Sequence, residues 1–487
     1  MKLYNKSMML LAGVAALPAA AFGANGKKAD NDRPNIILIM ADDMGWGDVG
    51  FNGNEYIKTP CLDSLANAGA VLNHFYSASP VSSPTRASVM TGRHPSRTGV
   101  FDANVGILRP EETTVAEILK ENGYSTGFFG KWHLGTMTCT ENDANRGKPG
   151  NTKEFNPPAL HGFDVVFSTE SKVPTWDPMK KPVRKKVSNK EWKYLEEGEE
   201  WVSYGTSYFD RDGNKITENI DGDDSRIIMD RAVEYIENSL DGDRPFLAVI
   251  WFHTPHLPVV AGPEFWDMYE GQRFMRNYAG SITAMDRQIR RLTKVLEQNG
   301  LSENTVMFFC SDNGPENGTP GSAGQYQGRK RSLHDGGVRV PSIAVWDGHI
   351  KAAEHDLPCS TADYLPTICD LAGISIENCP NILDGKSMAP ILLGKGRQEK
   401  KAIGFVYHNN HSLVDGKYKL YVEKGKTFLY DLDKDPEEKN DIAAKNPRIV
   451  KKLEKKYADF ISSCKASFEG EEYGRKSYDR MGQQWCY

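Results

Sequence analysis

The chain has 487 residues, of which 39% are hydrophobic and 26% are charged, and its formal net charge is −5. This length suits several domains or one large α/β unit with an appendage, and it allows a sizeable buried core. The slightly acidic balance excludes a general basic field for nucleic acid or anionic membranes, so we expect no nucleic-acid partner.

Residues 1–23 have the pattern of a signal peptide. Lys2 and Lys6 precede an apolar run over residues 8–17, and small residues over 19–24 offer a cleavage site. The run is too short to cross a bilayer, and no other stretch reaches about 18 apolar residues, so we expect no membrane insertion. A buried N-terminal helix is the alternative. The pattern predicts an exported, periplasmic protein.

Apolar, β-branched runs then alternate with segments of helical spacing. The runs cover residues 36–40, 126–129, 246–252, 306–310 and 342–346, and helical spacing covers 62–70, 114–122, 225–240 and 278–299. Buried strands that alternate with amphipathic helices are typical of an α/β fold with a mostly parallel sheet flanked by helices. Near the C-terminus, strands over 402–407, 418–422 and 428–432 and a helix over 448–463 predict a smaller subdomain of antiparallel sheet plus helix.

The stretch SSPTRASVMTGR, residues 82–93, combines a helix start with hydroxyl and guanidinium groups. Pro84 suits a first helical turn, and the following residues continue as helix. The amide end of such a helix, with Arg86 four residues after Ser82, forms an anion site. No G-x-S-x-G surrounds Ser82 and no general base is recognisable beside it, so an ordinary serine nucleophile does not fit.

Polar residues follow four of the expected strands. They are Asp42 and Asp43, Lys131 and His133, His253 and His256, and Asp312 and Asn313. Because ligands of open α/β sheets bind beyond the carboxyl ends of the strands, we expect these side chains to converge. The three carboxylates and the Asn313 amide form an all-oxygen set suited to calcium or magnesium, and not to zinc. Taken singly, each pair also fits a turn, a solvated loop or core histidines.

Six motifs occur in a fixed order between residues 42 and 341. The first two are Asp-Asp-x-Gly at 42–45 and Ser-x-Pro-x-Arg at 82–86, with Thr-Gly-Arg at 91–93. Then come Gly-Lys-Trp-His-Leu-Gly at 130–135, Pro-His-x-Pro at 255–258, Ser-Asp-Asn-Gly at 311–314, and Gly-Arg-Lys at 328–330 with 335–341. The order resembles that of the type I sulfatases, formylglycine-dependent members of the alkaline phosphatase superfamily. The resemblance covers about 35–393 and implies a catalytic domain over 24–395 and a subdomain over 396–487.

The resemblance also implies the nucleophile and the metal. Ser82 is expected to be oxidised to formylglycine (3-oxoalanine) by the anaerobic sulfatase-maturating enzyme, and the aldehyde hydrate is expected to attack sulfur. The expected Ca²⁺ ligands are Asp42, Asp43, Asp312, Asn313 and the modified Ser82.

The other matched residues are expected to bind the sulfate or move protons. Arg86 corresponds to the residue that stabilises the hydrate, Lys131 and Lys330 to the lysines that hold the sulfate oxygens, His133 to the histidine that helps break the intermediate, and His256 to the general acid. His253 is expected either to line the substrate pocket or to pack in the core. Ser168 corresponds to a polar sulfate contact in some members.

The sequence indicates the substrate less specifically than it indicates the reaction. A serine-type sulfatase with an export signal resembles bacterial enzymes that act on complex carbohydrates, and galactose or N-acetylgalactosamine sulfate is favoured. Residues 170–221 hold tryptophans and cations that form either a solvated face or a specificity loop; they are Trp176, Trp192, Trp201, Lys180, Lys181, Arg184, Lys185 and Lys186. Two alternatives remain: a phosphatase or phosphodiesterase of the same superfamily, and a glycan-binding protein with unmodified Ser82.

Overall fold

The structure is a computed structural model that describes residues 33–184, 188–397, 399–473 and 484–487. The expected signal peptide, as well as Lys185 and Lys186 of the expected specificity loop, therefore lies outside the described residues. Within the described ranges, no helix is both long and apolar enough to cross a bilayer.

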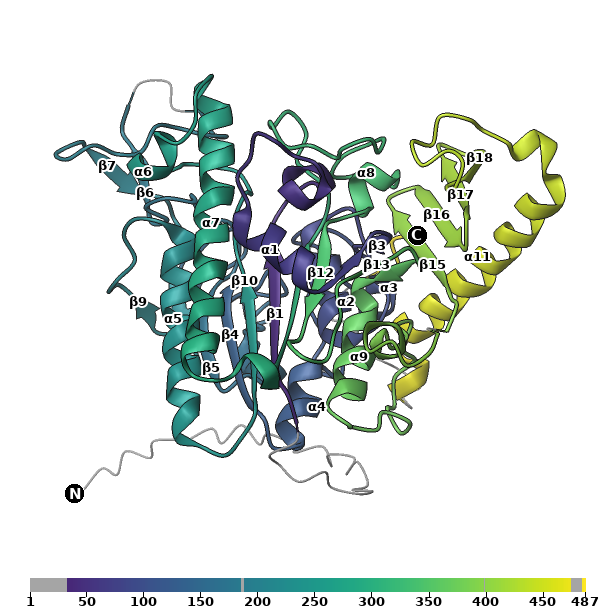
Figure 1. Ribbon diagram of the computed structural model, residues 1–487, viewed down its shortest axis with the longest axis horizontal. Helices are drawn as coiled ribbons and strands as arrows, with labels where there is room; N and C mark the ends of the chain where they lie inside the picture. Colours follow the sequence, from purple (N-terminus) through teal and green to yellow (C-terminus); the bar gives the residue numbers. More distant parts are fainter. Residues whose placement is uncertain (1–32, 185–187, 398, 474–483) are drawn as a thin grey trace, which may run out of the picture.

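A ten-stranded sheet forms the centre of the molecule, in the order β13-β2-β12-β11-β1-β10-β4-β5-β8-β9 (Figure 1). Its middle strands run parallel: β11 (Thr305–Ser311), β1 (Asn35–Ala41), β10 (Phe246–Trp251), β4 (Ser125–Lys131) and β5 (Val165–Thr169). The outer strands include the antiparallel pairings: β12 (Ser342–Val345), β2 (Ala70–Leu72), β13 (Ala353–His355), β8 (Tyr208–Asp210) and β9 (Lys215–Ile216). The predicted α/β class is confirmed, and the predicted strand at 342–346 joins the sheet antiparallel.

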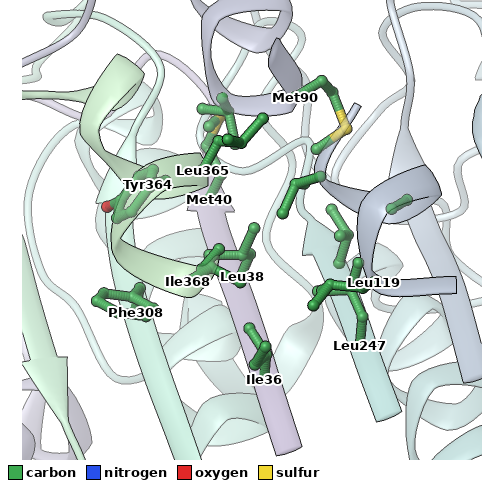
Figure 2. Close-up of a cluster of buried hydrophobic side chains, with 14 of the residues drawn as sticks. Ile36, Leu38, Met40, Met90, Leu119, Leu247, Phe308, Tyr364, Leu365 and Ile368 are labelled. Carbon is green, nitrogen blue, oxygen red and sulfur yellow. The ribbon is translucent and has the colours of Figure 1, made fainter. Parts of the chain in front are cut away.

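Alternation along β1 divides the core into two layers. Ile36, Leu38 and Met40 face α2 (Ser82–Thr91), α4 (Val115–Glu121) and α9 (Tyr364–Leu371), as Figure 2 shows. Ile37 and Ile39 face α1 (Pro60–Ala68), α5 (Asp224–Asn238) and α7 (Arg273–Gln298) on the other side. Because successive strand residues point to opposite faces, one apolar run supplies both layers.

The remaining elements are short, apart from the last helix. They are α3 (Pro95–Thr98), α6 (Pro263–Trp266), α8 (Asp335–Val338), α10 (Ala389–Leu392), α11 (Pro447–Phe468), and the two-stranded pairs β3 (Phe75–Tyr76) with β14 (Cys359–Ser360) and β6 (Lys180–Pro182) with β7 (Trp201–Ser203). The four long predicted helices are all present. The helix predicted from residue 278 begins five residues earlier, at Arg273, and Phe274 in its first turn is partly buried against the core.

The C-terminal part is a four-stranded antiparallel sheet covered by α11 (Figure 1). Its strands are β15 (Ala402–Tyr407), β16 (Asn410–Asp415), β17 (Tyr418–Glu423) and β18 (Lys426–Asp431). The predicted sheet-plus-helix subdomain is therefore confirmed, although β16 was missed because only two of its residues are apolar. One face of this sheet packs on Tyr76, Val81, Leu333 and Val338 of the main body.

Candidate active site

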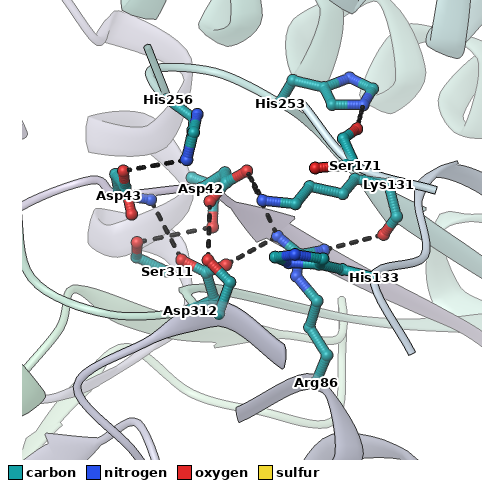
Figure 3. Close-up of polar contacts among 12 residues, drawn as sticks. Asp42, Asp43, Arg86, Lys131, His133, Ser171, His253, His256, Ser311 and Asp312 are labelled. Atoms are coloured by element: carbon teal, nitrogen blue, oxygen red, sulfur yellow. Dashed lines mark hydrogen bonds and ion pairs between the residues drawn. The ribbon is translucent and has the colours of Figure 1, made fainter. Parts of the chain in front are cut away.

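The residues singled out from the sequence meet at one edge of the central sheet (Figure 3). Asp42 and Asp312 directly follow the parallel strands β1 and β11, and Lys131 ends β4. Ser82 is the first residue of α2, a helix whose ten residues are all buried. Since parallel strands end at the same edge, the strand order β11-β1-β10-β4 brings these loops together.

Oxygen atoms surround the Ser82 hydroxyl. Its Oγ lies 3.2 Å from Asp42 Oδ1 and 3.4 Å from Asn313 Oδ1. The Asp43 backbone N–H donates to Asp312 Oδ1 at 3.0 Å, and Asn313 Nδ2 donates to Asp43 Oδ1 at 2.7 Å. The Asn313 amide nitrogen is thereby directed away from Ser82, which leaves its oxygen facing the serine.

Three cations balance the three carboxylates. Arg86 Nη2 lies 2.7 Å from Asp312 Oδ2, Lys131 Nζ lies 2.6 Å from Asp42 Oδ2, and Lys330 Nζ lies 2.6 Å from Asp43 Oδ1. All six side chains are buried. Such a cluster is stable only while its charges are paired, because an unpaired buried charge costs several kcal/mol, on the order of 3 to 5.

Burial and neighbouring charges shift the pKa values of the three carboxylates. Burial would raise the pKa of Asp42, but Lys131 and the other cations hold it well below its usual value. Burial raises the pKa of Asp43, and burial with the charge of Asp42 raises the pKa of Asp312 to about 6. Additional positive charge at this place therefore favours the fully ionised cluster.

Two histidines border the cluster, each with one ring nitrogen held by a neighbour. His256 Nδ1 donates to the Leu257 carbonyl at 2.7 Å, so its Nε2, 3.6 Å from Asp43 Oδ2, faces the centre. His133 Nε2 lies 3.1 Å from Asn104 Oδ1, while its buried Nδ1 has no hydrogen-bond partner among the described residues. Burial, aided by nearby cations, lowers the pKa of both rings, which keeps them neutral.

His253 and Ser168 are not brought into this cluster. The buried His253 ring uses both nitrogens, Nδ1 at 2.9 Å from Asp224 Oδ2 and Nε2 at 2.8 Å from Thr169 Oγ1. Ser168 donates its hydroxyl to the Gly130 carbonyl at 2.9 Å. These contacts fit the packing alternative that was left open for His253, and they use the Ser168 hydroxyl within the sheet.

The donor chemistry of the cluster fits a hard divalent cation. Ligand atoms of Asp42, Asp43 and His256 lie within 4.8 Å of one another, and this is the single group of three or more acidic, histidine or cysteine ligands in the described ranges. Asp312 accepts from the Asp43 backbone N–H, and Asn313 donates to the Asp43 carboxylate. Four oxygen-bearing side chains around one point suit calcium or magnesium.

Sequence reasoning missed two residues that support the site. Asn104 contacts the ring of His133, and Trp251 lies beneath Arg86, whose guanidinium carbon is 5.0 Å from the ring centroid. Trp251 lay in a predicted strand, but no sequence signal distinguished it from the other core residues. Asn104 lies in a loop 27 positions before Lys131 and carries no recognisable motif.

Comparison with known proteins identifies the family. A family model described as Sulfatase matches residues 34–374. The chain belongs to the sulfatase family. This sulfatase is therefore a sulfuric ester hydrolase, as the motif order predicted. A second model, described as N-sulphoglucosamine sulphohydrolase, C-terminal, matches residues 321–463.

Individual relatives agree with this assignment. The chain is similar to mouse N-acetylgalactosamine-6-sulfatase, 30% identical over 85% of this chain and 76% of the relative, and to human arylsulfatase A, 31% identical over 82% and 75%. Among solved structures it resembles Ps i-CgsB in complex with k-i-k-neocarrahexaose, with a TM-score of 0.74 and 27% identity over 88% of this chain and 92% of that one. A Bacteroides thetaiotaomicron protein described with the metabolism of multiple glycosaminoglycans gives 0.69 and 25% over 89% and 100%.

Proposed function

We propose that this sulfatase removes sulfate from saccharides, with Ser82 oxidised to formylglycine as the nucleophile. The placement of Ser82 carries the proposal, since its Oγ contacts Asp42 and Asn313 oxygens at the start of a buried helix. A serine nucleophile needs a base such as histidine at this place. A hydrated aldehyde supplies a nucleophilic oxygen without one.

Five side chains would hold the proposed Ca²⁺ ion: Asp42, Asp43, Asp312, Asn313 and the modified Ser82. When bound, Ca²⁺ lowers the pKa of the attacking hydroxyl and withdraws charge from a sulfate oxygen. The Asp43 backbone and Asn313 amide fix the carboxylates through hydrogen bonds of 3.0 and 2.7 Å. The ligands are thus oriented by the protein itself.

The three cations orient the ester. Lys131 and Lys330 end in Nζ atoms at the Asp42 and Asp43 carboxylates, so each is placed to share its hydrogens between a carboxylate and a sulfate oxygen. Arg86 is fixed by Asp312 and by the Lys131 carbonyl, at 2.7 and 2.9 Å, and lies near the nucleophile. This arrangement of cations is suited to align the sulfur of a bound sulfate with the Ser82 position.

The histidines have the geometry to transfer protons. His256 donates Nδ1–H to the Leu257 carbonyl, so in the neutral ring the Nε2 that faces the centre is unprotonated. We assign His256 the role of general acid: Nε2 first takes up a proton from solvent and then passes it to the departing sugar oxygen. His133 presents the unpartnered Nδ1, a buried acceptor suited to take a proton from the hydroxyl of the modified Ser82 when sulfate is released. Asn104 holds His133 in this tautomer.

The relatives support a saccharide substrate. One acts on N-acetylgalactosamine 6-sulfate by its name, and one solved structure holds k-i-k-neocarrahexaose. We propose a sulfated galactose or N-acetylgalactosamine unit. We also propose export to the periplasm with removal of residues 1–23, maturation by the anaerobic maturating enzyme, and the division into 24–395 and 396–487.

Peptide mapping of the protein from its native host tests the proposal. The peptide with Ser82 is expected to be lighter by two hydrogens, and sulfated saccharides are expected to release free sulfate. EGTA is expected to abolish release and to lower the melting temperature, and Ca²⁺ is expected to restore both. An unmodified Ser82 in a protein that still releases sulfate would overturn the nucleophile, and activity unaffected by EGTA would overturn the metal.

A further inference from the structure

A polar cavity of about 320 Å³ adjoins the site. Ser171 and Pro258 line it, and both continue from segments of the site. Pro258 lies two residues after His256, and the Ser171 carbonyl accepts from His253 Nε2 at 3.1 Å. The backbone N–H of His133 donates to the backbone carbonyl of Glu170, the residue before Ser171, at 2.9 Å. The cavity therefore lies next to the segment of His256, the residue assigned to the departing sugar oxygen.

Two lysines give the cavity a positive charge. Among the described residues that line it, Lys172 and Lys181 are charged and none is acidic. Neither amine has an ion-pair partner in the described part of the chain. Lys172 is also close enough to His256 for its charge to add to burial in lowering the pKa of that ring.

The adjacent residue Lys180 faces away from the cavity that Lys181 lines. Lys180 and Lys181 are consecutive residues of β6, so their side chains point to opposite sides. Lys180 Nζ lies 2.6 Å from Asp221 Oδ1 and 5.3 Å from the centroid of the Trp201 ring. The side chain of Lys181, on the opposite side of the strand, lines the cavity.

Three acids adjoin lining residues in the chain: Asp143, Glu170 and Glu191. Burial raises the pKa of Asp143 to about 7, and its Oδ1 accepts from the Ser207 N–H at 2.7 Å. The buried carboxylate of Glu170 accepts from Arg146 Nε at 3.0 Å, and Glu191 is held by both Nε and Nη2 of Arg273 at 2.7 Å. The lysine charges are therefore available to a ligand. Trp192 and Tyr204 add aromatic walls, and the side chain of Asn145 adds a polar one. Aromatic and amide groups beside cations suit an acidic sugar.

We propose that this cavity is a second anion subsite, in which Lys172 and Lys181 bind a carboxylate or a second sulfate on the sugar next to the one that loses its sulfate. The inference rests on the proposed function and narrows its substrate class to saccharides with a second acidic group near the scissile ester.

Kinetics of Lys172→Met and Lys181→Met test the subsite, with Lys180→Met as the matched control. The substrates are para-nitrophenyl sulfate, a sulfated galactosamine–uronic acid disaccharide, the same disaccharide with its carboxyl reduced to the alcohol, and a disulfated disaccharide. Each variant is expected to lose about tenfold in kcat/KM on an acidic disaccharide, the effect of one charge-assisted hydrogen bond, and less than about twofold on the aryl ester. Lys180→Met is expected to match the wild type.

The substrate arms distinguish the two sources of the anion. A lysine effect confined to the uronic acid substrate supports a carboxylate, and one confined to the disulfated substrate supports a sulfate. Wild-type turnover that is equal on the reduced disaccharide and on both acidic disaccharides, or variants that match the wild type on every disaccharide, would overturn the subsite while the sulfatase function stands.

A binding arm separates failure of the subsite from failure of the proposed function. If the matured wild type hydrolyses none of the esters, the proposed function fails. Calorimetry of Ser82→Ala with the acidic disaccharides then decides the subsite alone. Binding weakened about tenfold by either lysine substitution supports it, and equal or undetectable binding overturns it.

Discussion

At the scale of single residues, two residues of the site have unusual backbone conformations. Asp43 has φ 65° and His133 has φ 59°, in the left-handed region that non-glycine residues rarely adopt. Each lies two residues past a strand end, where this conformation sets the direction of its side chain within the site. The local strain of about 1 kcal/mol or more is borne because the surrounding ion pairs hold both segments.

Two adjacent serines give a matched residue-scale test. Ser82→Ala is expected to abolish sulfate release, because the residue that becomes the nucleophile is gone. Ser83→Ala is expected to keep release and stability, since the buried Ser83 hydroxyl has no hydrogen-bond partner among the described residues. Sulfate assays and thermal unfolding of both variants check this. Comparable release by Ser82→Ala would contradict the assignment.

At the scale of elements, α2 connects the site to the short segment that follows the C-terminal helix α11. The helix ends at Gly92, with φ 67°, and Arg93 then reaches Glu112 at 3.1 Å and Glu472 at 2.6 Å. The Thr-Gly-Arg motif therefore ends the helix and anchors it, whereas the first arginine of the signature, Arg86, faces the site. One short stretch thus carries both a chemical and a structural arginine.

The ion pair between Arg97, which lies just after Arg93 in the chain, and Asp384 predicts that the stability of the fold depends on pH. Burial alone would raise the pKa of Asp384, but the two N–H groups of Arg97, at 2.8 and 3.0 Å, hold it below its usual value. A lowered pKa stabilises the fold above about pH 4, and this stabilisation is lost as the pH falls through the folded pKa.

Asp384→Asn is therefore expected to lower the free energy of unfolding by about 2 kcal/mol at neutral pH. Urea unfolding at several pH values is expected to show a constant gap from the wild type down to about pH 4 and a closing gap below it. Asp459→Asn, which removes an exposed ion pair with Lys455, is the control and is expected to change little. A gap that closes well above that pH would contradict the lowered pKa.

At the scale of the whole molecule, a buried charge network joins the C-terminal sheet to the site. Lys419 Nζ lies 2.6 Å from Asp335 Oδ1 and 2.8 Å from Glu438 Oε1. Asp335 begins α8, five residues after Lys330, and its backbone N–H donates to Glu438 at 2.7 Å. The subdomain therefore supports the loop that supplies a site lysine.

Lys419→Met is expected to cost about 3 kcal/mol of stability and to lower sulfate release, because it removes the lysine that two buried carboxylates share and leaves Asp335 with Arg339 at 3.4 Å. Lys417→Met is the matched control, since it removes a partly exposed pair with Asp431 worth less than about 1 kcal/mol. Urea unfolding and sulfate assays of both variants test this. Equal stability of the two variants would show that the network is not needed to hold the subdomain in place.

The sequence by itself determined the fold class and the residues that gather at the site. Buried parallel strands read as apolar runs, and Asp42, Lys131 and Asp312 could be placed at their carboxyl ends. β16 was missed because only two of its six residues are apolar, and β5 was missed because its apolar run is three residues long.

Only the tertiary structure decided which neighbours hold those residues. Asn104 reaches His133, and Lys419 supports the loop of Lys330, although neither pair is close in sequence. Lys172 and Lys181, which are nearer in the chain, line one cavity because of how the loop between them folds. It also placed His253 in the core instead of the site, since both of its nitrogens find partners there. Periodicity and motifs record local preference, whereas these contacts depend on which distant segments the packed sheet brings together.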